Sequence, residues 1–439
     1  MAELTIIRST AEDAIQSRFA DYAARQSHWG GPAIARRRQD AFETLKATGL
    51  PTRRVEEWKY TDLRAFMRDL PPLADLPERA QVEAAERTKP LLALADACRF
   101  LFVNGRDFSS AKADGVAWYR LGNDDELPDS VTAALNRERS YAANTAVALN
   151  TAFMHDTTIL HVPAGVTVAT PLHLDFQTVA NAPLASFGRV LIVVEEGASA
   201  TVIETHRGPD GIAYQANTLV ELDVFDGASL NHIRCNAAGD TALSLSTLGL
   251  QTGRKAKVSS FAMTYGGAMS RHQIFATLSG EGTELILNGA TMLRARQHAD
   301  TTMVMNHAVG HCDSRELFKS VLDGESRSVF QGKIVVQPHA QKTDAKMAAH
   351  ALLLSEEAEA DAKPELEIFA DDVVCGHGAT AGSLDDDLLF YLKARGIPQK
   401  EAEALMVEAF IGETVEAVGN ETVRESLMEL ARAWLRARA

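Results

Sequence analysis

A cysteine and a histidine stand two positions apart in the segment CGHGAT, residues 375–380. In an extended strand, Cys375 and His377 would point to the same side, with Cβ atoms about 7 Å apart. That spacing suits two donors to a cluster, or a thiol facing an imidazole, better than two ligands of one small ion. Gly376 and Gly378 leave room beside His377 for another backbone or a ligand. Spacing alone, however, favours a buried, chemically inert pair.

A second group of candidate metal ligands lies in the segment NHAVGHCDS, residues 306–314. His307, His311 and Cys312 are all competent ligands for a borderline metal. Two histidines four apart share a face of a helix, but along a strand they lie about 13 Å apart. One strand cannot chelate a single ion with both, so we expect structural or surface roles for this group.

The composition excludes several classes of function. Acidic residues outnumber basic ones by 59 to 44, giving a net charge of −15, and no run of Lys and Arg is long enough to follow a phosphate backbone. No apolar run approaches the length of a bilayer span, and the first residues lack the pattern of a signal peptide. We therefore expect a cytoplasmic protein that binds neither nucleic acid nor membrane.

The cysteines agree with a reducing compartment. Cys98, Cys235, Cys312 and Cys375 form no C-x-x-C pair, so the sequence contains neither a disulfide framework nor a zinc ribbon. Any metal chemistry must therefore use isolated ligands that the fold brings together.

The elements that must position these residues change in texture along the chain. Residues 1–95 are predicted to form an N-terminal helical domain, where Ser9 and Glu12 have the spacing of a capping box. From residue 96 to 382, short β-rich runs alternate with turns. Their marker glycines are separated by 32, 30, 26 and 29 residues: Gly165, Gly197, Gly227, Gly253 and Gly282.

A repeat of about 30 residues favours a β-solenoid, in which each coil buries its inward side chains on its neighbours. A β-sandwich would also give closely spaced short strands, but it would not favour this repeat. We therefore predict a mainly β fold: a right-handed parallel β-helix over residues 96–382, flanked by helical domains.

Residues 383–439 are predicted to form a C-terminal helical domain. The run Asp385 to Asp387 places caps and negative charge at the start of a helix. The apolar residues of these helices offer more surface than a short bundle can bury on itself, which predicts a docking surface. Its residues are Leu388, Leu392, Leu405, Met406 and Phe410.

Long stretches of the sequence resemble the SufD family of the Suf iron–sulfur cluster assembly machinery. They are RRVEEWKYTDL near the N-terminus, SRELFKSVLDGESRSVFQGKIVV from residue 314, and the region from AQKTDAKMAAH to FYLKARGI, which contains VVCGHGAT. The E-H-E-A-T pattern of the paralogous SufB family is absent. The match is specific at both ends of the chain, whereas residues 100–310 resemble the family in their pattern of short β-rich runs more than in individual residues.

The resemblance implies a scaffold of a parallel β-helix between helical domains, and no enzyme. It implies pairing with SufB and with the ATPase SufC, the latter through the C-terminal helices. Cys375 and His377 match the family's C-x-H-G-A-T and would lie where nascent clusters form, at the interface with SufB. It further implies a transient iron–sulfur cluster and no tightly bound cofactor. It leaves open whether the complex holds flavin and whether the chain pairs with itself.

Two other classes remain as alternatives. Parallel β-helices also host carbohydrate-active enzymes, whose sites are charged clusters in a lateral groove. Asp371, Asp372 and the run Asp385 to Asp387 could form such a cluster, although the run is better explained as a helix start. The second alternative is an interaction module without a metal role.

Overall fold

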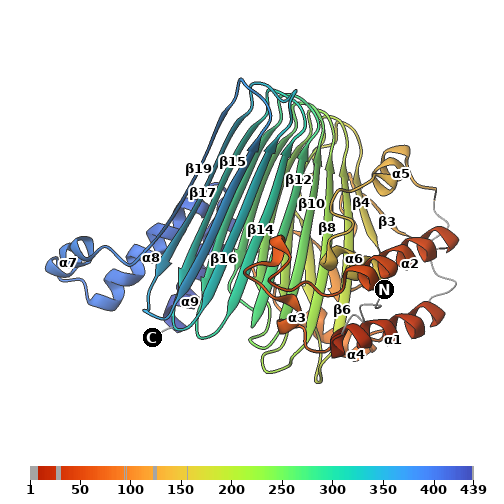
Figure 1. The fold of residues 1–439 in the computed structure, drawn as a ribbon, viewed down its shortest axis with the longest axis horizontal. Coiled ribbons are helices and arrows are strands. Elements are labelled where there is room, and N and C mark those ends of the chain that lie inside the picture. The colour runs from red at the N-terminus through yellow and green to blue at the C-terminus, as the bar shows by residue number, and fades with distance from the viewer. Residues whose placement is uncertain are drawn as a thin grey trace, which may run out of the picture.

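The strands of the chain form a two-sided solenoid that carries helices on its outer faces, as the computed structural model shows (Figure 1). The structure describes residues 8–25, 31–92, 94, 96–121, 126–155 and 157–437. In this part of the chain the strands form two sheets, named here sheet A, with nine strands, and sheet B, with ten. Successive coils add one strand to each sheet, so the predicted parallel β-solenoid is confirmed.

From β4 onward, consecutive strands of the chain alternate between the two sheets. Sheet A contains β3 (Ala117–Arg120), β4 (Thr158–Val162), β6 (Ala185–Val194), β8 (Gln215–Val224), β10 (Leu243–Thr252), β12 (Met269–Leu278), β14 (His298–His307), β16 (Arg327–Val336) and β18 (Glu359–Ile368). Sheet B contains β1 (Cys98–Val103), β2 (Arg106–Asp107), β5 (Leu172–Gln177), β7 (Ser199–Arg207), β9 (Ser229–Ala237), β11 (Lys257–Thr264), β13 (Glu284–Leu293), β15 (Asp313–Leu322), β17 (Asp344–Leu353) and β19 (Val374–Gly382). These strands lie within the predicted span 96–382, while the division into three domains remains a prediction.

Neighbouring strands of one sheet are about 30 residues apart in sequence, as the glycine spacing predicted. In sheet A, Ala185 pairs with Gln215, and Leu243 pairs with Met269, which are offsets of 30 and 26 residues. A parallel pair needs a long return path, and the strand in the opposite sheet provides it. Each full coil thus has two strands, mostly of nine or ten residues, which are longer than the short runs predicted.

One column of turns explains most of the marker glycines. Gly165, Gly197, Gly227 and Gly282 have φ between 64° and 74°, where a side chain is unfavourable. Gly253 was a wrong member of this set, because Lys255, at φ 52°, occupies the equivalent turn position. The predicted repeat of about 30 residues is unaffected by this error, because Gly253 and Lys255 are close in sequence.

The space between the sheets contains the main hydrophobic core. Alternate side chains of each strand point into it, among them Val190 and Ile192 of β6 and Val202 of β7. In the later coils, Ala345 and Met347 of β17 belong to the same core. The residues paired with these two on β19 therefore lie on the inner face of the last strand.

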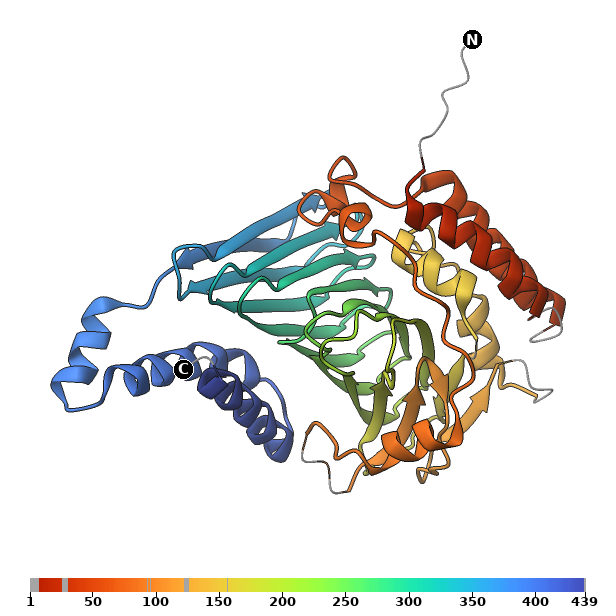
Figure 2. The same ribbon diagram turned by 90° about the horizontal axis from the view of Figure 1, so that it is seen from below.

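Helices from the N-terminal half cover the outer face of sheet A (Figure 2). They are α1 (Thr10–Arg25), α2 (Gly31–Thr48) and α6 (Thr145–Phe153), while α3 (Leu63–Phe66), α4 (Arg79–Arg87) and a 3-10 turn (Glu56–Trp58) connect them to the solenoid. The predicted capping box is present, since Ser9 N–H donates to Glu12 at 2.6 Å and Glu12 N–H donates to Ser9 Oγ at 3.3 Å.

Two helices interrupt the segment that was predicted to be entirely β. They are α5 (Asp129–Asn136) and α6. Every residue of α6 is buried, between the outer face of sheet A and α1 and α2. A helix that is buried on all sides has no polar face to give it a helical period, and its short, mostly apolar run cannot be told from a buried strand by periodicity.

The C-terminal helices cover the opposite face of the solenoid. In Figure 2, α8 (Gln399–Val415) and α9 (Glu421–Ala437) lie against sheet B, where Ile411 and Leu427 pack on Ile233 and Phe261. The helix α7 (Asp386–Ala394) projects away from the solenoid and buries none of its residues. Across the described ranges, no helix combines the length and the apolar character needed to span a membrane.

Residues 53–62 cross the outer face of sheet A near its last strands. Trp58 is 2% exposed and stacks on the guanidinium of Arg271 from β12, with Cζ 3.8 Å from the ring centroid. Lys363 of β18 forms an ion pair with Glu56. This segment therefore ties the N-terminal region to the final coils.

We expect replacement of Trp58 by alanine to destabilise the protein strongly. Truncating a buried tryptophan typically costs about 3–5 kcal/mol, and here it also uncovers the buried Arg271. Chemical unfolding should show the loss, whereas Val55→Ala, at a side chain that is 41% exposed, should change little. Equal stabilities of the two variants would contradict the anchoring role of Trp58.

Candidate functional site

Cys375 and His377 lie on β19, the last strand of sheet B. This strand pairs with β17 along one side, and its other side has no strand partner in the described part of the chain. Cys375 is half-buried and His377 is exposed. The pair thus occupies the edge of a sheet at the terminus of the solenoid, and it is accessible from outside.

Both side chains lie on the inner face of β19. Cys375 pairs with Ala345, and His377 with Met347, and these two β17 residues point into the core between the sheets. Cys375 itself packs against that core. The predicted placement of both residues on one strand face is confirmed, and the exposure of His377 does not fit the interpretation as a fully buried pair.

Burial raises the pKa of the Cys375 thiol, and the charges of Asp344 and Glu316 add to this rise. The isolated chain therefore holds this cysteine as a neutral thiol at neutral pH. A thiolate is the form that attacks or binds metal, so Cys375 needs a nearby cation or another subunit's groups to become reactive.

The terminus formed by β18 and β19 is called the open end here, because each strand is the last of its sheet. Apolar side chains that would lie under a further coil are exposed: Phe369 by 59% and Val374 by 61%. Near this end lies a cavity of about 220 Å³, lined by residues of β15 to β19, mainly alanine, serine and phenylalanine. The open end thus presents unpaired strand edges and exposed apolar side chains to a partner.

The two histidines of NHAVGHCDS lie in different surroundings, one buried and one on the surface. His307 ends β14 inside the core and lies 3.1 Å from Ser314 Oγ. His311 is exposed in the turn column, at φ 57°. Cys312 is fully buried, and its thiol donates to the carbonyls of Gly280 and Gly310. Within the described ranges, no three His, Cys, Asp or Glu side chains converge closely enough to hold a metal ion.

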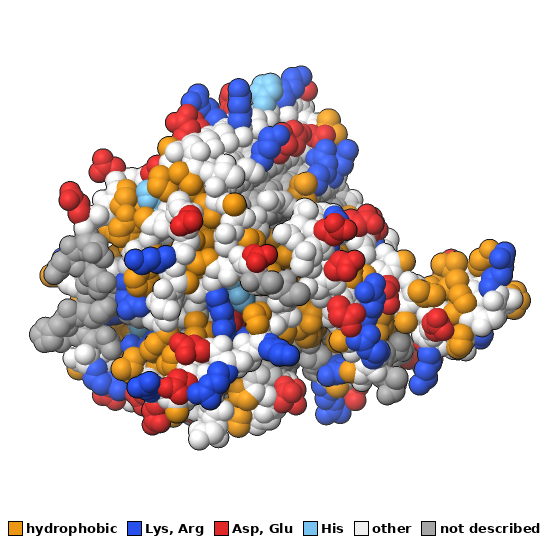
Figure 3. Space-filling model, turned by 180° about the vertical axis from the view of Figure 1, so that it is seen from behind, with side chains coloured by type: hydrophobic (Ala, Val, Ile, Leu, Met, Phe, Trp, Pro, Cys, Tyr) orange, Lys and Arg blue, Asp and Glu red, His pale blue; other side chains and the backbone are white. Residues whose placement is uncertain are grey.

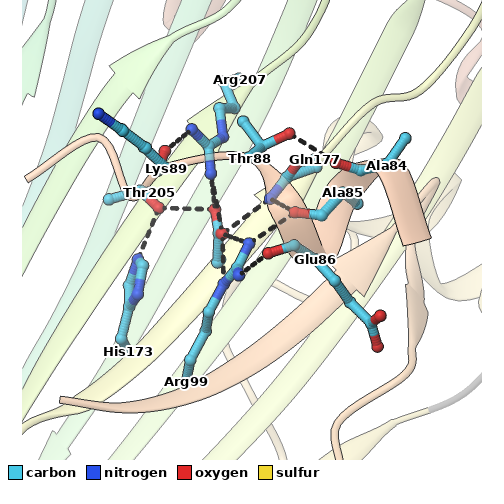
Figure 4. Close-up of polar contacts among 11 residues, drawn as sticks. Ala84, Ala85, Glu86, Thr88, Lys89, Arg99, His173, Gln177, Thr205 and Arg207 are labelled. Carbon is cyan, nitrogen blue, oxygen red and sulfur yellow. Dashed lines mark hydrogen bonds and ion pairs between the residues drawn. The ribbon is translucent and has the colours of Figure 1, made fainter. Parts of the chain in front are cut away.

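A histidine, a threonine and an aspartate meet on the outer face of sheet B (Figure 4). Thr205 Oγ1 lies 2.8 Å from His173 Nε2 and donates to Asp175 at 3.1 Å, so the histidine donates to the threonine and is no base for it. Arg99 and Arg207 both pair with Asp175 and bind backbone carbonyls at or beyond the end of α4. This set is a structural anchor, because Asp175 and Thr205 are fully buried.

The predicted docking residues are divided between surface and core. Leu388 and Leu405 are 47% and 44% exposed, and Leu392 and Met406 are half-buried. Phe410 instead packs against sheet B, with Lys319 Nζ 4.5 Å from its ring centroid. Phe410 is thus the predicted docking residue that packs within the protein.

The most exposed apolar residues of α7 are not among the predicted docking residues. Phe390 is 73% exposed and Tyr391 is 52% exposed. Figure 3 shows apolar side chains gathered on this projecting part. The predicted docking residues were chosen along one apolar face of each helix. Because α7 has no buried face, Phe390 and Tyr391 could be found only from the large apolar content of the whole helix.

Comparison with family models covers nearly the whole chain. Residues 176–410 match the SufBD core domain of the SUF system for FeS cluster assembly, and residues 11–174 match the N-terminal region of SufBD proteins. The chain belongs to the SufBD family. The core-domain match includes the open end with Cys375 and His377.

Individual SufBD proteins are similar along most of their length. The iron-sulfur cluster assembly protein SufD of Escherichia coli is 32% identical over 89% of this chain and 90% of its own length. The SufBD family protein slr0076 of Synechocystis is 31% identical over 88% and 87%. SufD of Bacillus subtilis is 29% identical over 64% and 65%. The predicted resemblance to SufD is confirmed, and this SufBD protein is a subunit of the Suf iron–sulfur cluster assembly machinery.

Proposed function

We propose that this chain is a scaffold subunit that pairs with SufB through the open end. The observation that carries this proposal is the location of Cys375 and His377 on the unpaired edge of β19. A second β-helix could continue both sheets by pairing with β18 and β19, which would satisfy their backbone groups and cover Phe369 and Val374. A second copy of the chain has the same edges, so self-association competes with this pairing.

At that junction, Cys375 and His377 would bind iron or sulfide in transit. A thiolate and a neutral imidazole are both good donors to iron. Two donors from one chain leave an iron coordinatively open, so the partner must supply the others. The cluster is thus cargo to be released, and the proposal includes no tightly bound cofactor.

The same proposal assigns α7 to the ATPase SufC. Its support is the projection of this helix from the solenoid with Leu388, Phe390 and Tyr391 exposed together. Removing residues 384–439 would be a poor test, because α8 and α9 cover sheet B and their loss would uncover its core.

We expect the double variant Phe390→Ser, Tyr391→Ser to lose most SufC and to retain SufB when the three proteins are co-expressed and co-purified. Large aromatic side chains dominate interface energies, so at least about a tenfold weaker association is expected. The matched control is Leu76→Ser, at an exposed leucine elsewhere, which should leave both partners bound. Full SufC retention by the double variant would refute the assignment of α7.

A non-catalytic role is supported over a carbohydrate-active enzyme. Asp385 caps α7, its carboxylate accepting from the N–H groups of Asp387 and Leu388, and Asp371 and Asp372 lie in the turn before β19. Asp385 is thus accounted for by capping, and Asp372 by its ion pair with Lys342. We place the assembly in the cytoplasm, because Cys98, Cys235, Cys312 and Cys375 are all free thiols.

A further inference from the structure

Glu316 of β15 is a carboxyl group buried in the solenoid interior near the open end. It is 2% exposed, and neither of its carboxyl oxygens forms a hydrogen bond of normal geometry with the residues that the structure describes; the Ser314 hydroxyl makes the one weaker polar contact. A buried carboxyl group normally has partners, and one without them points to a functional role or to a ligand. The sequence analysis gave no signal for it, since a single glutamate in a strand is usually exposed.

The strand register places Glu316 under the candidate site. Leu287, Glu316, Met347 and His377 follow one another as direct partners across β13, β15, β17 and β19. Leu287 and Met347 belong to the interior core, so the row points inward. With strands about 4.8 Å apart, Glu316 and His377 are separated by roughly 10 Å between Cα atoms. Cys375 lies in the neighbouring row, close enough that an ionised Glu316 raises the pKa of its thiol.

The surroundings of Glu316 offer it little compensation. Burial raises its pKa to about 8, and the smaller opposing effects come from the hydroxyl of Ser314 and the charge of Arg315. Ser314 is itself engaged with His307. The carboxyl group is therefore mostly neutral at pH 7 in the isolated chain, and a cation nearby would favour its anion.

We propose that Glu316 is the interior counter-charge for a metal cation bound at Cys375 and His377. This inference rests on the proposed function of those two residues. The carboxylate need not touch the metal, because the intervening medium is the apolar interior, where a charge pair is screened less than in water. When ferrous iron binds, Glu316 loses its proton to solvent and the resulting anion stabilises the cation.

We expect Glu316→Gln to weaken ferrous iron binding by the SufB–SufC complex of this chain on the order of tenfold. The probe is ferrous iron, titrated without oxygen at pH 7 and followed by metal binding and by proton release in weak buffer. The wild type should release about one more proton per iron than the variant. Glu316→Asp, which keeps a carboxyl group, should restore part of the affinity.

The variant His377→Ala separates the proposed iron site at Cys375 and His377 from the counter-charge role of Glu316. If His377→Ala leaves iron binding unchanged, the proposed site itself is wrong. If His377→Ala weakens binding while Glu316→Gln matches the wild type in affinity and proton release, only the counter-charge role is overturned.

A second readout tests the burial on which the inference depends. The folded pKa lies above the ordinary value of 4.5, so the neutral carboxyl group contributes stability that is fully present below pH 4.5 and is lost as pH rises through about 8. Glutamine cannot titrate, so the unfolding midpoint of the variant should gain on the wild type across this range. Since His307, Arg315 and Cys375 are common to both proteins, the comparison isolates Glu316. Parallel pH profiles would overturn the placement.

Discussion

Replacing His377 by alanine is expected to stop cluster accumulation without preventing assembly of the complex. The side chain is exposed on an edge strand, so its removal leaves no cavity in the core. It also removes one of the two donors that this chain would offer to iron, and loss of a metal-site group typically costs tenfold or more in affinity. The variant complex should keep its ATPase activity and bind at least about tenfold less iron and sulfide after anaerobic reconstitution.

The matched control is His350→Ala, one strand away on β17. His350 Nδ1 lies 2.7 Å from Thr380 Oγ1, so this histidine also contacts β19. It does not share the inner row of His377. Cluster formation should be normal in this control. Normal cluster maturation in cells that carry both His377→Ala and Cys375→Ser would contradict the role of the pair.

The second large effect is expected at the open end itself. Phe369→Asp together with Val374→Asp would place two charges where a partner must cover apolar side chains. Two central interface residues commonly contribute about 2 kcal/mol each, so binding of SufB should weaken by a factor on the order of 1,000. The variant itself should fold, because both side chains are mostly exposed in the isolated chain.

This variant and the α7 variant control each other. The open-end variant should lose SufB and retain SufC, and the Phe390, Tyr391 variant should do the reverse. Leu76→Asp tests whether an added charge on any exposed leucine has the same effect. Unimpaired co-purification of SufB with the open-end variant would rule out this interface.

The solenoid could be predicted from the sequence because its repeat leaves a physical mark. Each coil must turn at the same place, and Gly197 and Gly227 mark that turn by their positive φ. Where a non-glycine such as Lys255 occupies this turn position, the mark is lost, and the nearby Gly253 is mistaken for it. The helix α6 escaped detection because it is buried on all sides, which removes the periodicity that distinguishes a surface helix.

The candidate site was only partly predictable. The alternation of a strand gave the shared face of Cys375 and His377, but not which face it was, since that depends on the pairing of β19 with β17. The position of the chain's last coil, and therefore the exposure of this face, followed from tertiary structure. Glu316 lies 61 residues before His377, and only the register of three strands brings the two together.

The most direct test of the account is the accessibility of Cys375 with and without SufB. In a Cys98→Ser background, the remaining thiols Cys235 and Cys312 are buried, so a maleimide reagent should label Cys375 selectively. The account predicts slow but complete labelling of the isolated chain, protection when SufB is added, and no protection in the Phe369→Asp, Val374→Asp variant. Equal labelling rates of the wild-type residue in the free chain and in an assembled complex with SufB would contradict the placement of Cys375 at the interface.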